Sequence, residues 1–422
     1  MSTHTLAMTK EKSPTLVVFS AGAFFFYSFI QMTLLGTETM KAFFMDNLAL
    51  SSAAEFGNFA GAFLYGTVLM LIPAGVILDK YSVKKSLLAT LLLMIACSFG
   101  LSITTDVFSA SLLRFLMGAA HCIAFMAPFR LAPRWFPSEK LALVAGSLVA
   151  FAVFGGFVSG APLLAIINAT SVQIAMVLNT LLGGIILLMV LLFVQDSPDG
   201  EVEAQGLQIS LIEGLKLAAK NKQNWLAGTF IGMLNLSVLL LGAVWGTTYL
   251  RFINPEFTEA TYTGIIGMIF IGTMLGSPVT GLISDKLQSR KKAMLGGAII
   301  SLAIMLLIMF PPSTSAGFFY VMFLLLGILT SAQSIGYPVI GESNQDKVLG
   351  TANGLSAVIL MGIGAIGQPF FGKLVSSFGG TSSASPLQMQ AALQSAIWIM
   401  PIAFVISIVC VLFLDETFNH NH

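Results

Sequence analysis

Charged side chains are scarce in this sequence. Of its 422 residues, 9% are charged and 56% are hydrophobic. A soluble domain carries about 25% charged residues, and it needs polar side chains to cover its core. The composition therefore excludes an ordinary cytosolic enzyme, a nucleic-acid-binding protein and a disordered chain. It favours a protein that crosses a lipid bilayer several times.

Cysteine is rare as well, with three residues in the chain. Cys97, Cys122 and Cys410 all fall within long apolar runs and show no metal-ligand spacing, so we expect neither disulfides nor a metal site. The sequence lacks a phosphate-binding G-x-x-x-x-G-K-[ST] segment, and no nucleophile–base pair stands out in its loops. We therefore expect no cofactor, no use of ATP and no enzymatic activity.

Long apolar runs, in contrast, are abundant. A membrane-spanning helix needs about 20 apolar residues, whereas the strand of a membrane β-barrel has about ten of alternating polarity. Twelve runs reach the helical length: 14–38, 53–77, 84–104, 107–131, 143–167, 172–195, 224–250, 260–284, 292–312, 316–341, 350–376 and 390–414. The sequence thus predicts an all-α protein with twelve transmembrane helices.

The longest polar interruption, 196–222, separates six spans from six. We expect two six-helix bundles, 1–195 and 223–422, joined by this linker. Within it, residues 207–220 are predicted to form a short amphipathic helix at the membrane surface.

The basic residues are distributed unevenly between the two sides of the membrane. With the N-terminus inside, sixteen of the twenty Lys and Arg residues lie in cytoplasmic segments. Lys41, Arg251 and Lys373 lie outside, and Arg114 lies within a span. The positive-inside rule therefore predicts that both termini are cytoplasmic.

An internal repeat relates the two halves. Gly75-Val-Ile-Leu-Asp79-Lys80 in the second loop is repeated as Gly281-Leu-Ile-Ser-Asp285-Lys286 in the eighth, at an offset of 206 residues. Pairs of basic residues follow both copies. A repeat of this kind indicates two six-helix halves in parallel orientation, a plan known among transporters.

These loops resemble the signature G-x-x-x-D-[RK]-x-G-x-[RK]-[RK] of the major facilitator superfamily, although Ser82 and Gln288 replace its internal glycine. Arg114-Phe-Leu-Met-Gly118 in the fourth span is similar to the R-x-x-x-G of that family, and Trp135-Phe-Pro to a segment common after the same helix. The resemblance covers the whole chain. It implies a secondary transporter of the cell (inner) membrane that works by alternating access.

The resemblance also implies that the repeated loops latch the cytoplasmic side when the transporter opens outward. The predicted gating residues are Gly75, Asp79, Lys80, Lys84, Lys85, Gly281, Asp285, Lys286, Arg290 and Lys291. Asp79 is expected either to face a helix N-terminus or to pair with Arg130 or Arg134. The alternative is that the basic residues of these loops only determine topology.

Polar residues in the middle of spans are the candidates for substrate binding. In the family that the chain resembles, helices 1, 4, 7 and 10 line a central cavity, and the candidates on them are Tyr27, Gln31, Arg114, His121, Asn235, Trp245, Tyr249, Gln333, Ser334 and Tyr337. Arg114, Gly118 and His121 share one helix face, which we expect to point toward water.

Each candidate also has a structural alternative. Arg114 could snorkel to the headgroups or pair with Asp106, and His121 could simply be a packed histidine. Tyr27 and Gln31 could form an interhelical hydrogen bond. Trp245 and Tyr249 suit an outer aromatic belt equally well.

Acidic residues are missing from the middle of every predicted span, which leaves Arg114 and His121 as the central charges. A cationic cavity favours an anionic or zwitterionic substrate: an organic acid, an amino acid or a carboxylate siderophore. His121 is the best-placed residue for proton coupling and Glu38 the next. We expect a monomer whose partners are this small molecule, protons and the bilayer, and no nucleic acid.

The direction of transport is a further prediction. Proton antiporters of the family carry a fifth-helix motif that ends G-x-x-x-G-P-x-x-G-G. Here the segment reads Gly156-Phe-Val-Ser-Gly160-Ala-Pro162, with the proline displaced by one position. This favours proton-coupled uptake. The alternatives are a proton-antiport exporter of a drug or siderophore and a non-transporting membrane receptor or sensor.

Overall fold

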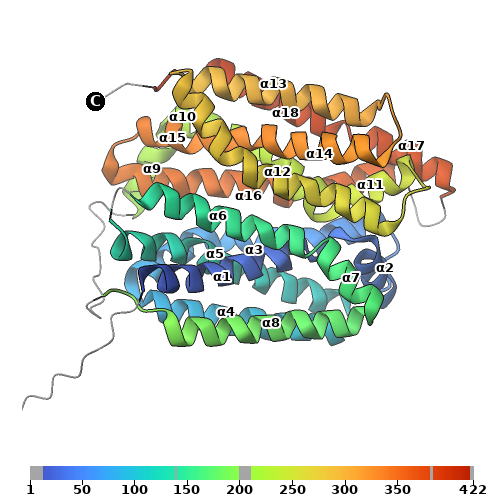
Figure 1. The fold of residues 1–422 in the computed structure, drawn as a ribbon, viewed down its shortest axis with the longest axis horizontal. Helices are drawn as coiled ribbons and strands as arrows, with labels where there is room; N and C mark the ends of the chain where they lie inside the picture. The colour runs from blue at the N-terminus through green and yellow to red at the C-terminus, as the bar shows by residue number, and fades with distance from the viewer. Residues whose placement is uncertain (1–12, 138–139, 199–210, 381–383, 419–422) are drawn as a thin grey trace, which may run out of the picture.

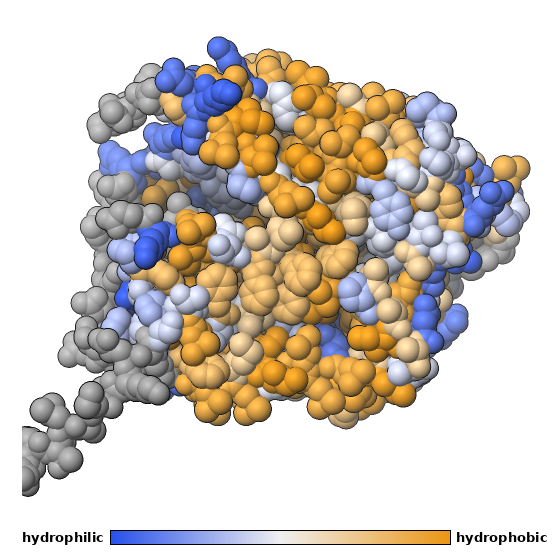
Figure 2. Space-filling model, viewed as in Figure 1, coloured by the Kyte–Doolittle hydropathy of each residue, from blue (hydrophilic) through white to orange (hydrophobic). Residues whose placement is uncertain are grey.

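The computed structural model describes residues 13–137, 140–198, 211–380 and 384–418. Within these ranges, twelve helical segments are long and apolar enough to cross a membrane, which confirms the predicted number. Apolar side chains cover the middle of the face seen in Figure 2, and polar ones gather at its two ends. This distribution suits a bundle whose middle lies in hydrocarbon.

The N-terminal half contains the first six spans. Its helices are α1 (Pro14–Thr33), η1 (Leu34–Gly36), α2 (Glu38–Asn47), α3 (Ala53–Lys80), α4 (Val83–Ile103), α5 (Val107–Trp135), α6 (Leu141–Val158), α7 (Ala161–Ala169) and α8 (Val172–Phe193). The helix predicted over 207–220 is present as α9 (Leu211–Lys220), and residues 207–210 lie outside the described ranges.

The C-terminal half contains the other six spans. Its helices are α10 (Lys222–Leu236), the π-helix η3 (Ser237–Trp245), α11 (Gly246–Ile253), α12 (Glu259–Lys286), α13 (Arg290–Met309), α14 (Ala316–Thr330), η4 (Ser331–Ile335), α15 (Gly336–Glu342), α16 (Asp346–Ser377), α17 (Pro386–Ala396) and α18 (Ile399–Phe413). The two halves lie side by side with their helices nearly parallel (Figure 1).

The bundle has two distinct ends. The repeated loops, between α3 and α4 and between α12 and α13, lie at one of them, which we call the motif end. The other, which we call the distal end, carries α2, α7, α11 and α17 and is on the right in Figure 1.

Glycine brings equivalent helix pairs into backbone contact in each half. A Cβ on Gly118 of α5 would lie 1.7 Å from the carbonyl oxygen of Phe63 in α3. In the C-terminal half, a Cβ on Gly327 of α14 would lie 2.3 Å from the carbonyl oxygen of Ile269 in α12. Only a residue without a side chain allows such an approach, so these glycines fix the rotation of α5 and α14.

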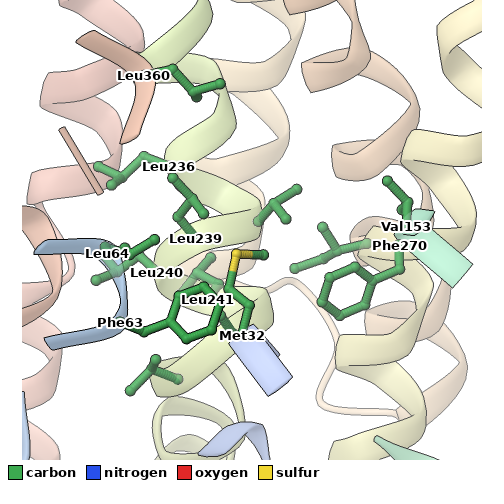
Figure 3. Packing of buried hydrophobic residues seen from close by; sticks show 14 of the residues in the cluster. Met32, Phe63, Leu64, Val153, Leu236, Leu239, Leu240, Leu241, Phe270 and Leu360 are labelled. Atoms are coloured by element: carbon green, nitrogen blue, oxygen red, sulfur yellow. The ribbon is translucent and has the colours of Figure 1, made fainter. Parts of the chain in front are cut away.

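The halves meet at the distal end. Gly57 of α3 packs against the backbone of Gln368 and Pro369 in α16, and Gly156 of α6 packs against the ring of Phe270 in α12. Nearer the centre, an apolar layer joins α1, α3, η3 and α12 (Figure 3). Its residues include Met32, Phe63, Leu64, Leu239, Leu240, Leu241 and Phe270, all of them buried.

Candidate functional site

A cavity of about 400 Å³ lies between the halves. Its wall includes Phe129 near the end of α5, Ala145 near the start of α6 and Ala357 of α16, all toward the motif end. Since the apolar layer and the helix contacts close the distal side, the cavity belongs to a conformation that is open toward the motif end. Its volume is in the range of small-molecule sites, about 300–1,000 Å³.

Five of the predicted binding residues line this cavity: His121, Asn235, Gln333, Ser334 and Tyr337. Gln333 Nε2 donates to Asn235 Oδ1 at 3.4 Å, a weak bond that leaves both amides able to bind a ligand. The C-terminal half thus presents neutral donors and acceptors to the cavity.

His121 is the basic side chain that the N-terminal half contributes to this wall. Its Nδ1 shares a 2.9 Å hydrogen bond with Ser28 Oγ of α1. The rings of Phe25, Phe29 and Phe63 surround it, with centroids 5.5–6.3 Å from that of the imidazole. The hydrogen bond fixes the orientation of the imidazole, and the aromatic residues limit its contact with water.

Arg114 does not line the cavity in this conformation. Its side chain is buried, and it donates to the carbonyl oxygens of Gln31 at 3.0 Å and Ala60 at 3.2 Å. Its guanidinium carbon lies 5.4 Å from the ring centroid of Phe63, whose ring is also in contact with His121. Phe63 therefore lies between the two predicted central charges.

This placement differs from the expectation that Arg114, Gly118 and His121 point together toward water. Because Gly118 packs on the α3 backbone at Phe63, the shared face turns toward α3. His121 lies about one helical turn beyond Gly118 toward the motif end, and its side chain still reaches the cavity. The alternative pairing with Asp106 does not occur, because that carboxylate accepts from the Ser109 N–H at the start of α5.

Arg114 lacks an acidic partner among the described residues, where the ion pairs involve other side chains. Within the part of the chain that the structure describes, its Nε and both amide atoms of Gln31 have no hydrogen-bond partner. A buried charge is normally paired, and buried polar atoms are normally satisfied. This cluster is therefore equipped to receive a ligand that accepts hydrogen bonds.

Tyr27, Trp245 and Tyr249 are buried away from the cavity. The hydroxyl of Tyr27 faces α8, since a Cβ on Gly183 would lie 2.8 Å from it. Trp245 packs between Phe56 and Phe371 near the distal end. Both Trp245 and Tyr249 are 1% exposed, so they do not form the lipid-facing aromatic belt that was their alternative.

Several cavity residues were absent from the sequence prediction. They are Thr67 of α3, Thr273 and Ser277 of α12, and the aromatic residues Phe25, Phe29, Phe125 and Phe129. Thr67 and Thr273 occupy equivalent positions, 206 residues apart, and each donates to a carbonyl four residues earlier in its helix. The repeat offset was the signal that could have found them.

The two repeated loops use different ion pairs. In the N-terminal half, Asp79 pairs with Arg130 of α5, one of the two arginines predicted for it. In the C-terminal half, Arg290 binds both Asp285 at 2.7 Å and Glu342 of α15 at 2.9 Å. Each of these ion pairs joins two residues of the same half. In this conformation they therefore do not connect one half to the other.

The remaining loop residues are either hydrogen-bonded within their own half or exposed to solvent. Asp196 accepts from the backbone N–H of Lys84 at the start of α4, and Glu416 accepts from that of Arg290 at the start of α13. Lys291 Nζ donates to the carbonyl oxygens of Leu412 and Leu414. Lys80, Lys85 and Lys286 are exposed, and Gly75 and Gly281 have open space beside them. Gln288, one of the glycine replacements, adopts φ 48°, the region that glycine favours.

Glu38, the second residue predicted for proton coupling, lies at the distal end. Its carboxylate accepts from the hydroxyls of Thr247 and Thr248 and from Arg251 Nη1 at 3.3 Å. Close by, Thr39 donates through its backbone and its hydroxyl to Glu259 of α12. Glu38 thus joins the two halves where they are closed, and it does not line the central cavity.

Comparisons with known proteins agree with this architecture. The sequence model of the Major Facilitator Superfamily matches residues 15–332 and 236–422. The chain is similar to the hexuronate transporter of Bacillus subtilis (strain 168), with 23% identity over 356 residues that cover 81% of this chain and 84% of that protein.

Solved structures share the fold. A bacterial homologue of the human lysosomal transporter Spinster, in an inward-facing and unoccupied conformation, superposes with a TM-score of 0.74 at 13% identity, over 95% of this chain and 96% of that one. A variant of the nucleoside transporter NupG superposes with a TM-score of 0.71 at 14% identity, over 94% of this chain and 98% of that one.

Proposed function

The chain belongs to the major facilitator superfamily and is a multi-pass transporter of the cell membrane, and on that premise we propose that it takes up a small organic anion together with protons. The substrate class is a carboxylate that carries hydroxyl groups, as a sugar acid does. Both termini lie in the cytoplasm, and the monomer is the working unit.

One observation supports an anion above all: the buried, unpaired guanidinium of Arg114. A cation held inside a membrane protein without a counter-ion is costly, and such residues usually serve substrate or ion pathways. A substrate carboxylate would accept the hydrogen bond that Arg114 Nε leaves unmade. Phe63 covers the guanidinium in this conformation, and its ring would turn aside when the carboxylate binds.

The rest of the cavity suits the polyhydroxylated part of a sugar acid. Asn235, Gln333, Ser334 and Tyr337 offer neutral donors and acceptors for hydroxyl groups. Phe25 and Phe125, on the opposite half, offer apolar faces against which a sugar ring can pack. The hexuronate transporter to which the chain is similar is named for a substrate of this class.

The proposed cycle follows from which end is open. If the repeated loops are cytoplasmic, as the positive-inside rule predicts, the cavity faces inward and the contacts of Glu38 form the closed outer gate. Rotation of the halves would break those contacts and bring the Asp79 and Asp285 loops together as the inner latch. His121, between the cavity and Arg114, is the proposed proton carrier.

A second candidate, export of an amphipathic drug or siderophore, is favoured by a different observation. Phe25, Phe29, Phe125 and Phe129 pack as a cluster on one side of the cavity, with neighbouring centroids 5.4–6.3 Å apart. Such a cluster would bind an aromatic compound as readily as a sugar ring.

Reconstituted vesicles separate the two candidates. We expect uptake of D-glucuronate, driven by an inward proton gradient, but no uptake of D-glucose, which lacks the carboxylate. The Arg114→Met variant provides the matched control and should lose the uptake. Transport of cationic aromatic compounds without transport of carboxylates would overturn the proposal in favour of the exporter.

A further inference from the structure

A second cavity, of about 210 Å³, lies at the distal end. Its wall combines α2 of the N-terminal half with η3, α11 and α17 of the C-terminal half. Helices α2, α11 and α17 lie on the right in Figure 1. Ser51 and Arg251 line it and are exposed, so the cavity opens at the molecular surface. It is separate from the central cavity, with which it shares no lining residue.

Lys41 places an incompletely compensated cation in this wall. Its Nζ donates to Thr248 Oγ1 at 2.9 Å and lies 4.6 Å from the ring centroid of Trp245. No carboxylate of the described residues lies within 4.0 Å of this nitrogen. Glu38, the acid that acts electrostatically on Lys41, is instead bound by Arg251 and two threonine hydroxyls.

The charges of the residues that line the cavity therefore do not balance; outside this lining, the carboxylate of Glu55 accepts from Ser51 of the wall. Two cations, Lys41 and Arg251, share one carboxylate, that of Glu38. Burial lowers the pKa of Lys41, Glu38 acts in the opposite direction, and Arg251 adds to the lowering. A negative charge placed beside the Lys41 ammonium would relieve this imbalance.

Trp245 supplies a hydrogen-bond donor without an acceptor in the same wall. The side chain is 1% exposed and lines the cavity, yet none of the described residues is a hydrogen-bond partner of its indole Nε1. Buried indole N–H groups usually find an acceptor. A cation that shares its carboxylate with Arg251 and a donor without an acceptor thus lie in the wall of one small cavity that is open to the surface.

We propose that this distal cavity binds a small carboxylate anion, held by the Lys41 ammonium and the indole N–H of Trp245. The choice of a carboxylate rests on the proposed function of the chain, because the same anion class would be present at this face. The volume suits a single small acid, and the aromatic rings beside Lys41 would pack against its carbon skeleton.

The position of the site has a consequence for the transport cycle. Lys41 belongs to α2 and Trp245 to η3, so the site is complete only while the halves are closed at this end. A ligand that binds one conformation alone shifts the population toward it. The bound carboxylate therefore stabilises the closed distal gate, and a high external concentration of the acid slows reopening.

Trp245 provides the reporter for a direct test. Purified wild-type protein is titrated with sodium acetate, sodium D-glucuronate and D-glucose while tryptophan emission is recorded. We expect a saturable change with both carboxylates and none with D-glucose. The change should be absent in Trp245→Phe and shifted at least about tenfold to higher concentration in Lys41→Met, because a charge-assisted bond is lost.

Three variants complete the design. Lys373→Met removes an exposed basic residue of α16 outside the cavity and should behave as wild type. Lys41→Arg should retain the response. Arg114→Met should also retain it, since that arginine lies near the central cavity; a response lost in Arg114→Met but kept in Lys41→Met would overturn the distal site.

The outcome separates this proposal from the proposed function. If vesicles transport D-glucuronate but the emission of Trp245 does not change, the distal site is wrong and the transport proposal stands. If both carboxylates give the Lys41-dependent change but no carboxylate is transported, the distal site stands and the transport proposal fails.

Discussion

In the N-terminal half, His121 of α5 meets Ser28 of α1, and in the C-terminal half Thr330 of α14 meets Ser237 at the start of η3. The two hydrogen bonds measure 2.9 and 3.3 Å. Each residue lies 209 positions before its counterpart. The halves therefore keep the same helix contact, with a titratable ring in one and a neutral hydroxyl in the other.

The same offset reveals a second difference. Arg114 corresponds to Phe323, and Gln31 corresponds to Leu240, both fully buried apolar residues. The two halves thus share the backbone arrangement, while of these described positions the N-terminal half alone carries a charge. We infer a division of roles, in which the N-terminal half binds the charged group and the C-terminal half contacts neutral parts of the substrate.

The largest expected effect on transport comes from removing the charge of Arg114. Arg114→Met should lower kcat/KM for D-glucuronate uptake about tenfold to a hundredfold, through loss of charge-assisted hydrogen bonds. The melting temperature should stay equal or rise, because an unpaired buried charge is also removed. Phe323→Leu, the matched change in the other half, should alter uptake by less than about twofold. Equal losses in both variants would contradict the division of roles.

The second largest effect is expected at His121, on accumulation of the substrate against its gradient. His121→Gln keeps a hydrogen-bonding group toward Ser28 but cannot carry a proton, so accumulation driven by a proton gradient should disappear while substrate exchange across the membrane continues. Thr330→Val should leave both intact. Accumulation and exchange are measured in the same vesicles with labelled substrate. An unchanged pH profile in His121→Gln would remove this residue from the proton pathway.

The repeated loops should respond unequally as well. Asp79→Asn breaks the ion pair with Arg130 and should reduce the initial uptake rate up to about fivefold, without affecting membrane insertion. In Asp285→Asn the partner Arg290 keeps Glu342, so the loss should be less than about twofold. Full activity of Asp79→Asn would argue against the latch.

The smallest effect is expected on stability, from the carboxylates that accept hydrogen bonds at the starts of α4 and α13. Burial tends to raise the pKa of Glu416, but hydrogen bonds from Ser289 and from the backbone of Phe418, Arg290 and Lys291 outweigh it and hold the pKa below its usual range. The stability from this group is therefore present above the ordinary glutamate pKa of about 4.3 and is lost as pH falls through the lowered value. Glu416→Gln should lower the free energy of unfolding by less than about 1 kcal/mol at pH 7.

Thermal melts of wild type and Glu416→Gln at several pH values test this last prediction, with Asp196→Asn as the counterpart in the N-terminal half. The difference between wild type and Glu416→Gln should shrink toward acid pH. A constant difference across the pH range would show that the carboxylate charge is not what stabilises α13.

The sequence was sufficient for the number of spans and the repeat, and insufficient for the rotation of individual helices. Run length reflects bilayer thickness, so the spans follow from composition, whereas α9 follows from its amphipathic pattern. Whether Arg114 points into the cavity depends on the contact of Gly118 with α3, which no pattern within one helix reveals.

Local departures from α-helix also lie beyond the sequence pattern. Residues Ser237–Trp245 form a π-helix. Such helices are rare in proteins, and those that occur often lie at functional sites. Asn235, just before it, lines the central cavity, whereas Trp245 lines the distal one. The apolar sequence of this segment gives no sign of the change in helix type.

The backbone contact of Gly118 with Phe63 has a mechanical consequence. Helices that touch along their backbones cannot slide without a clash, so α3 and α5 move as one rod. The Arg114, Phe63 and His121 backbone positions then travel together through the cycle, and only the surface opposite them changes. A pair of spin labels placed one on α3 and one on α5 should keep its distance distribution in every state, while a pair placed across α3 and α16 should not.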